Sequence, residues 1–169
     1  KTNMKHFFTL LFCAIMVLPG QSCTNNIFLT SQADVNNFNT NYGCDSIFGD
    51  LTITGAVTSL VGLGNIEYIS GNLSIYSSNI TSTAGFTNLN KVGGSFSLAY
   101  NQVLVSITGW EALEYVGRTI SVLGNPLANS LVMDNVEYVG LPEEHYGLDQ
   151  ILVLSNGALT QLNTFKKVK

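Results

Sequence analysis

The residues best suited to acid–base or metal chemistry in this sequence lie together in the segment Pro142-Glu143-Glu144-His145-Tyr146. An imidazole beside two carboxylates could exchange protons with a substrate or coordinate a metal ion. No cysteine or second histidine accompanies His145, and no Ser-His-Asp triad can be assembled without it. A solvated loop is the simpler interpretation, so we expect no catalytic residue, no metal site and no cofactor. The protein is predicted not to be an enzyme.

A second set of residues could recognise a partner without covalent chemistry. Glutamate and tyrosine recur together just before an apolar residue, and Asn90-Lys91 holds the same place between them. If these segments stack, their side chains form a column of carboxylates and aromatic rings. The alternative is a solvated acidic edge whose tyrosines cover a corner of the fold. We rank this column first among possible partner surfaces, and its residues are Glu67, Tyr68, Glu114, Tyr115, Glu137 and Tyr138.

Residues 1–22 are predicted to be a signal peptide. The apolar run at 7–18 is too short to span a bilayer, and Pro19-Gly20 follows it. We therefore expect an exported protein, either secreted or held at the outer cell surface. The predicted mature chain has five basic and eleven acidic residues, a net charge of −6, because Lys1 and Lys5 leave with the signal and no acid does. This balance argues against nucleic acid and anionic membranes as partners.

The mature chain keeps two cysteines, Cys23 and Cys44, because Cys13 belongs to the signal. An even pair in an oxidising compartment predicts a disulfide. The alternative is that Cys23, directly after the signal, is acylated as in bacterial lipoproteins, which would leave Cys44 unpaired. A lipid at Cys23 would be the protein's sole link to a membrane.

A repeat of 22 to 24 residues predicts the elements that position these side chains. Apolar anchors stand at positions 47, 69, 92, 116 and 139, and each of the first four is followed by a short segment with two apolar residues spaced by two. This spacing is typical of strands with one buried face, and the fixed period is typical of stacked coils. In the last coil an insertion at 140–149 separates the anchor from a fully apolar strand at 151–154. Before the anchors at 69, 92, 116 and 139 an apolar residue recurs every third position, which indicates turns rather than a long helix. Trp110 shares its register with Leu63, Phe86 and Met133, so we expect it in the core rather than stacked on a sugar.

The domain plan is an N-terminal cap at residues 23–46 and a solenoid at 47–169, with the last coil incomplete. The cap is expected to hold a strand at 27–30, a helix starting at Ser31 with Asp34 in capping-box position, and the Cys23–Cys44 disulfide. Association of copies through the C-terminal coil is a further expectation. Asparagines follow most of the strands, and we expect them in left-handed conformation at the corners, as for Gly55; they are Asn79, Asn101, Asn125 and Asn156.

The segments at 47–53, 60–63 and 66–75 resemble the receptor L-domain family, which includes the ligand-binding lobes of insulin- and epidermal-growth-factor-type receptors. They also resemble leucine-rich-repeat-like exported surface proteins of Bacteroidetes-type bacteria. The resemblance extends over residues 23–162 and implies a right-handed parallel β-helix of about five coils, an all-β solenoid with a role in binding or adhesion. The ligand-contact residues of the receptors have no counterparts here.

Together these observations predict a non-catalytic secreted or cell-surface module that recognises protein or glycan. The alternative is a structural or adhesive segment of a larger surface protein. A glycan-cleaving enzyme is disfavoured, because no carboxylate pair stands at matched strand positions.

Overall fold

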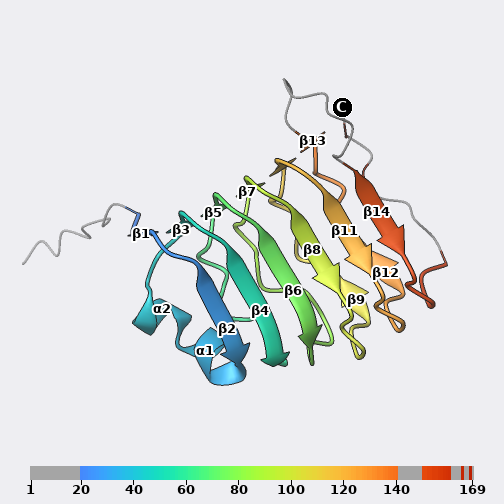
Figure 1. Cartoon of the computed structure of the whole chain (residues 1–169), viewed down its shortest axis with the longest axis horizontal. Coiled ribbons are helices and arrows are strands. Elements are labelled where there is room, and N and C mark those ends of the chain that lie inside the picture. The colour runs from blue at the N-terminus through green and yellow to red at the C-terminus, as the bar shows by residue number, and fades with distance from the viewer. Residues whose placement is uncertain (1–19, 141–149, 161–164, 166–167, 169) are drawn as a thin grey trace, which may run out of the picture.

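The computed structural model describes residues 20–140, 150–160, 165 and 168. It shows a β-solenoid of about five turns in which all strand pairs are parallel. Figure 1 shows the coils following one another along the molecule, with two short helices at the β2 end. The predicted solenoid fold is confirmed. Glu143, Glu144 and His145 lie outside the described residues.

Two six-stranded sheets make up most of each coil. The wide sheet has the order β14-β11-β8-β6-β4-β2, and the narrow sheet has the order β1-β3-β5-β7-β10-β13. The wide sheet comprises β2 (Ile27–Ser31), β4 (Leu51–Ala56), β6 (Leu73–Ser78), β8 (Phe96–Ala99), β11 (Ile120–Leu123) and β14 (Ile151–Leu154). The narrow sheet comprises β1 (Ser22–Cys23), β3 (Ser46–Ile47), β5 (Tyr68–Ile69), β7 (Lys91–Val92), β10 (Tyr115–Val116) and β13 (Tyr138–Val139). A third sheet pairs β9 (Ser106–Ile107) with β12 (Ser130–Leu131).

The stack begins one rung earlier than the repeat pattern indicates. Strand β2 pairs in register with β4, and β1 pairs with β3. Ile27 and Leu29 are buried as the inward pair of this first rung, and Phe28 points outward. The segment predicted as a cap therefore supplies the first strand of both sheets as well as the covering helices.

The helices α1 (Gln32–Asn36) and α2 (Phe38–Asn41) cover the start of the core. Ser31 and Asp34 form the predicted capping box, which satisfies backbone donors at the start of α1. Hydrogen bonds from the Thr30 backbone and then from Ser31 hold the pKa of Asp34 below its ordinary value. Val35 and Phe38 are buried, so the helices pack against the first coil. In the described part of the chain no helix is long and apolar enough to cross a membrane.

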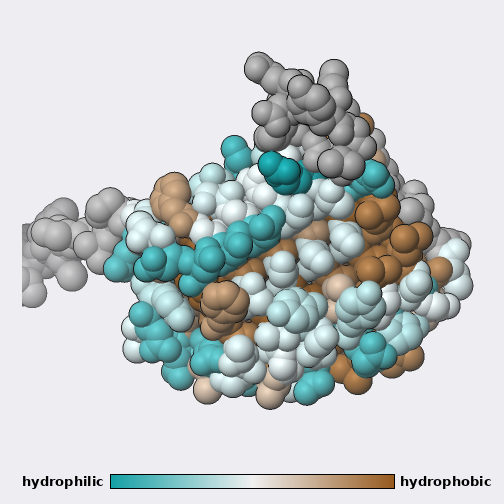
Figure 2. Space-filling view, in the orientation of Figure 1, coloured by the Kyte–Doolittle hydropathy of each residue, from teal (hydrophilic) through white to brown (hydrophobic). Residues whose placement is uncertain are grey.

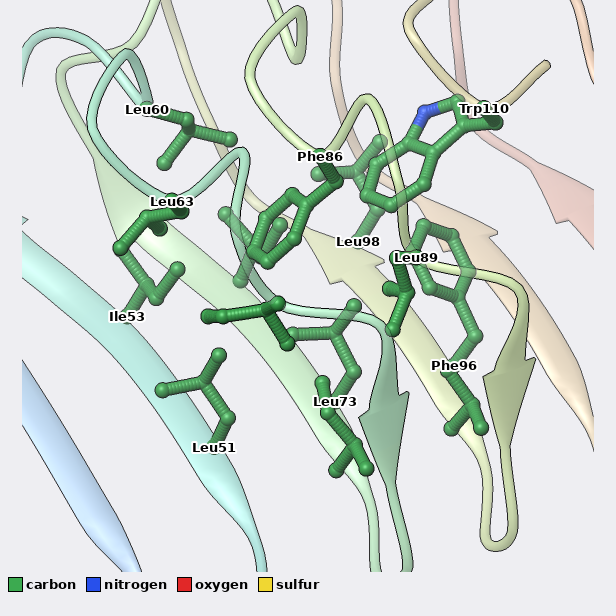
Figure 3. Packing of buried hydrophobic residues seen from close by; sticks show 14 of the residues in the cluster. Leu51, Ile53, Leu60, Leu63, Leu73, Phe86, Leu89, Phe96, Leu98 and Trp110 are labelled. Carbon is green, nitrogen blue, oxygen red and sulfur yellow. The ribbon is translucent and has the colours of Figure 1, made fainter. Parts of the chain in front are cut away.

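The core runs unbroken through the stack, because each strand of the wide sheet places alternate residues inside. Figure 3 shows pairs such as Leu51 and Ile53 facing the apolar residues of the return turns. Trp110 is buried, as predicted: its ring stacks on Phe86 at 5.3 Å and meets Phe96 edge-on at 4.8 Å. Its indole Nε1 donates to Oγ1 of Thr83 at 3.0 Å, so the polar atom of this large side chain is satisfied.

The corner asparagines have a different role from the one predicted. The left-handed residue is the one at the fifth position counted from the start of the wide strands β4, β6, β8, β11 and β14: Gly55, Ser77, Tyr100, Gly124 and Ser155. From β6 onward the sixth position forms an inward ladder of Ser78, Asn101, Asn125 and Asn156, whereas Ala56 at the sixth position of β4 is exposed. Asn101 and Asn125 are fully buried, and the side chain of each accepts a hydrogen bond from the coil before it and donates one to the coil after it. Asn79 falls one position too late and is exposed, and Ser78 takes its place.

Candidate functional site

The narrow sheet brings the three predicted tyrosines onto one outward face. Its strands have two residues each, and the second is an inward anchor, so the first must point out. In-register pairing then aligns Tyr68, Lys91, Tyr115 and Tyr138, which we call the tyrosine column. The register therefore places these side chains in one column, and its role as a partner surface stays a prediction.

The side chains of the tyrosine column touch one another. The Nζ of Lys91 lies 4.5 Å from the ring centroid of Tyr115 and 5.8 Å from that of Tyr68. The rings of Tyr115 and Tyr138 are 6.4 Å apart and tilted by 40°. Phe48 extends the contact beyond the column, because its ring meets Tyr68 edge-on at 5.9 Å. Sequence reasoning placed Lys91 in this register but missed that its ammonium lies between two rings.

A second column runs beside the first, one residue earlier in each coil. Backbone hydrogen bonds of 2.8 to 2.9 Å link each member to the next coil, and the members, which we call the acidic column, are Asp45, Glu67, Asn90, Glu114 and Glu137. Asp45 was missed by sequence reasoning. Its signal was its place two residues before the anchor Ile47, as Glu67 stands two before Ile69.

The acidic column makes this side of the molecule negative. Within the described residues there are eight carboxylate side chains and two basic ones, Lys91 and Arg118. Four of the eight carboxylates belong to the acidic column, and Glu67 and Glu114 are exposed to solvent. A ligand approaching the tyrosine column therefore meets a local excess of negative charge.

A hollow of about 220 Å³ lies at the N-terminal end of the acidic column, and its lining residues are Gly43, Cys44, Asp45, Asn65, Glu67 and Asn88. The amide nitrogen of Asn88 donates to the Gly64 carbonyl at 2.8 Å, and that of Asn65 donates to Asn39 at 3.3 Å. Both amides thus keep their side-chain oxygens as acceptors. With the two carboxylates, the polar side chains around this hollow are rich in acceptors.

The disulfide between Cys23 and Cys44 is present, as predicted, and its Cα atoms are 5.8 Å apart. It ties β1 to the residue before Asp45 and so fixes one wall of the hollow. A sulfur atom in this bond is not available for a thioether to lipid. The lipid alternative for Cys23 therefore requires the bond to be absent.

The outer face of the wide sheet carries a different pattern. Its central rungs align the hydroxyl residues Thr52, Ser74, Ser97 and Ser121. The outermost rungs carry apolar residues instead, Phe28 on β2 and Leu152 on β14. Figure 2 shows hydrophobic surface gathered where β11 and β14 lie.

The arrangement is suited to non-covalent recognition. Across residues 20–140 and 150–160, no group of three or more His, Cys, Asp or Glu residues could hold a metal ion. The tyrosine column lies on two-residue strands and the acidic column directly before them, and backbone hydrogen bonds between coils hold both in place.

A family model described as the receptor L domain matches residues 43–167, which include both columns and the hollow. No solved structure matched the chain.

Proposed function

The chain belongs to the receptor L domain family, and from this premise we propose that its ligand binds along the tyrosine and acidic columns of the narrow sheet. Membership of the family indicates a ligand-binding, non-catalytic module. The observation that carries the proposal is the in-register contact of Tyr68, Lys91, Tyr115 and Tyr138 on one outward face. Aromatic side chains supply much of the binding energy at interfaces, because they bury a large area with few rotatable bonds.

The module is proposed to work outside the cell, where it recognises a protein or a glycan. The family and the disulfide both fit an extracellular domain. Residues 1–22 are proposed as the export signal, with one structural consequence: a cut before Cys23 would remove Ser22, which pairs with Ser46 in β3.

The proposal is tested by screening the mature protein against a glycan array and a panel of extracellular protein domains. For any ligand that binds in this screen, we expect Tyr115→Ala combined with Tyr138→Ala to weaken binding by about tenfold or more. Tyr76→Ala is the matched control, because Tyr76 and Tyr138 are both 42% exposed and Tyr76 lies on the wide sheet. Unchanged binding by the double variant would remove the tyrosine column as the ligand surface.

A second candidate function is adhesion between copies through the end of the wide sheet. It is favoured by the outward residues of β14, because Leu152 is 36% and Leu154 is 55% exposed. Size-exclusion chromatography with light scattering tests it: Leu152→Ser with Leu154→Ser should convert an oligomer to monomer. A wild-type protein that stays monomeric at high concentration would argue against adhesion by this route.

A further inference from the structure

The tyrosine column already holds a cation of the protein's own. Lys91 Nζ lies near the rings of Tyr115 and Tyr68, within the range at which ring quadrupoles attract a positive charge. Tyr138 continues the column on the far side of Tyr115. The tyrosine rings of this surface attract cations, and the contact of Lys91 with Tyr68 and Tyr115 is an example within the protein itself.

The neighbouring groups favour a cation for an independent reason. The acidic column lies beside the rings, and it contains half of the carboxylates in the described residues. A positively charged ligand is steered to such a face, whereas an anionic ligand is repelled.

The residues that line the hollow indicate which chemical group of the ligand would fit there. Asp45 and Glu67 can only accept hydrogen bonds when ionised, and the amides of Asn65 and Asn88 keep their oxygens as acceptors. A sugar hydroxyl both donates and accepts, but a guanidinium presents five donors and no acceptor. Both arginine and lysine can contact aromatic faces, but only the planar guanidinium of arginine pairs with a carboxylate through two parallel bonds.

The spacing of the carboxylates indicates the conformation of the ligand chain. Adjacent parallel strands lie about 4.8 Å apart, so Glu67 and Glu114, two rungs apart, are separated by about 9.6 Å along the stack. A polyproline II helix rises about 3.1 Å per residue with three residues per turn, so every third side chain repeats at about 9.3 Å. An extended strand repeats its same-face side chains at about 6.8 Å, which matches neither one rung nor two.

We propose that the ligand is a protein segment in polyproline II conformation with arginines three residues apart, lying along the two columns. One arginine enters the hollow at Asp45 and Glu67, and the next reaches Glu114 beside the Tyr115 ring. Prolines between them pack on the tyrosine rings. This inference rests on the proposed function, because it names the ligand class of the same surface.

Two fluorescein-labelled peptides of identical composition test the inference by fluorescence anisotropy. One has arginine at every third position with prolines between, and the other has the same arginines together at one end. We expect the evenly spaced peptide to bind about tenfold more tightly, and its affinity to fall as salt rises. Equal affinity of the two peptides would overturn the polyproline II register.

Matched protein variants complete the test. Glu67→Gln combined with Glu114→Gln should weaken the spaced peptide by about tenfold and flatten its salt dependence. Glu111→Gln is the control, because Glu111 is exposed and outside both columns. Unfolding followed by the fluorescence of buried Trp110, the single tryptophan, shows whether each variant is folded. Equal affinity of the spaced peptide for the wild-type protein and for the Glu67→Gln, Glu114→Gln variant would refute the inference.

The result also separates this inference from the proposed function. A glycan or a non-basic protein that loses affinity in the Tyr115→Ala, Tyr138→Ala variant, with no binding of the arginine peptides, would overturn the arginine segment and keep the column as the ligand surface. If every ligand binds the Tyr115→Ala, Tyr138→Ala variant as tightly as the wild type, both the proposed function and the arginine segment are overturned.

Discussion

Replacing Asn101 by alanine tests whether the buried asparagine ladder stabilises the solenoid. The Asn101 side chain makes four hydrogen bonds: Oδ1 accepts from the backbone and hydroxyl of Ser78, and Nδ2 donates to Ile75 and Asn125. At about 1 kcal/mol for each bond, their loss lowers the free energy of unfolding by about 4 kcal/mol. This is a large share of the 5 to about 15 kcal/mol that stabilises a typical domain.

The measurement is urea unfolding followed by the fluorescence of Trp110, with linear extrapolation to zero denaturant. Asn79→Ala is the control, because this asparagine also follows a strand but is exposed and outside the ladder. We expect it to change stability by less than about 0.5 kcal/mol. Equal effects of the two substitutions would refute the argument that burial and inter-coil bonding, rather than residue type, give the ladder its strength.

Three further predictions concern the N-terminal part and the core. Replacing Cys23 and Cys44 by alanine should cost about 3 kcal/mol, because the disulfide closes a loop with a sequence separation of 21; thermal unfolding with and without reductant measures it. Asp34→Ala should cost about 1 kcal/mol at neutral pH. Because the folded pKa of Asp34 lies below 3.8, this contribution is complete above that value and is lost as the pH falls through the folded pKa; the two proteins should converge in stability at low pH. Thr83→Val should cost about 2 to 4 kcal/mol in urea unfolding, because the Thr83 hydroxyl accepts from both Trp110 and a backbone N–H, and a buried donor without a partner is costly.

The solenoid and the outward columns could be predicted from the sequence because parallel in-register stacking converts a repeat period directly into spatial neighbours. Once positions 47, 69, 92, 116 and 139 were aligned, the residue before each anchor had to share a face with its counterparts. The repeat period alone therefore predicts that Tyr68, Lys91, Tyr115 and Tyr138 align in one column.

Three features could not be predicted from the repeat period: the first rung, the asparagine ladder and the contact of Lys91 with two rings. Strand β2 lacks a glycine before it, so its alternating residues were assigned to a cap instead of a rung. The ladder requires the sixth residue from the start of each wide strand, and Asn79 is the seventh. The contact of Lys91 with two rings depends on side-chain rotamers, which the order of residues does not fix.

The inter-coil hydrogen bonds have a consequence for how this protein can change in length. Asn101 bonds to Ser78 before it and Asn125 after it, and the narrow sheet pairs only neighbouring rungs. Stability in such a stack is carried by nearest-neighbour contacts. Duplicating one coil, such as residues 92–115, would repeat every contact that the copy needs and would lengthen both columns by one rung of about 4.8 Å. For a ligand that binds along the columns as proposed, a longer ligand could then be matched by duplicating single coils, without redesign of the core.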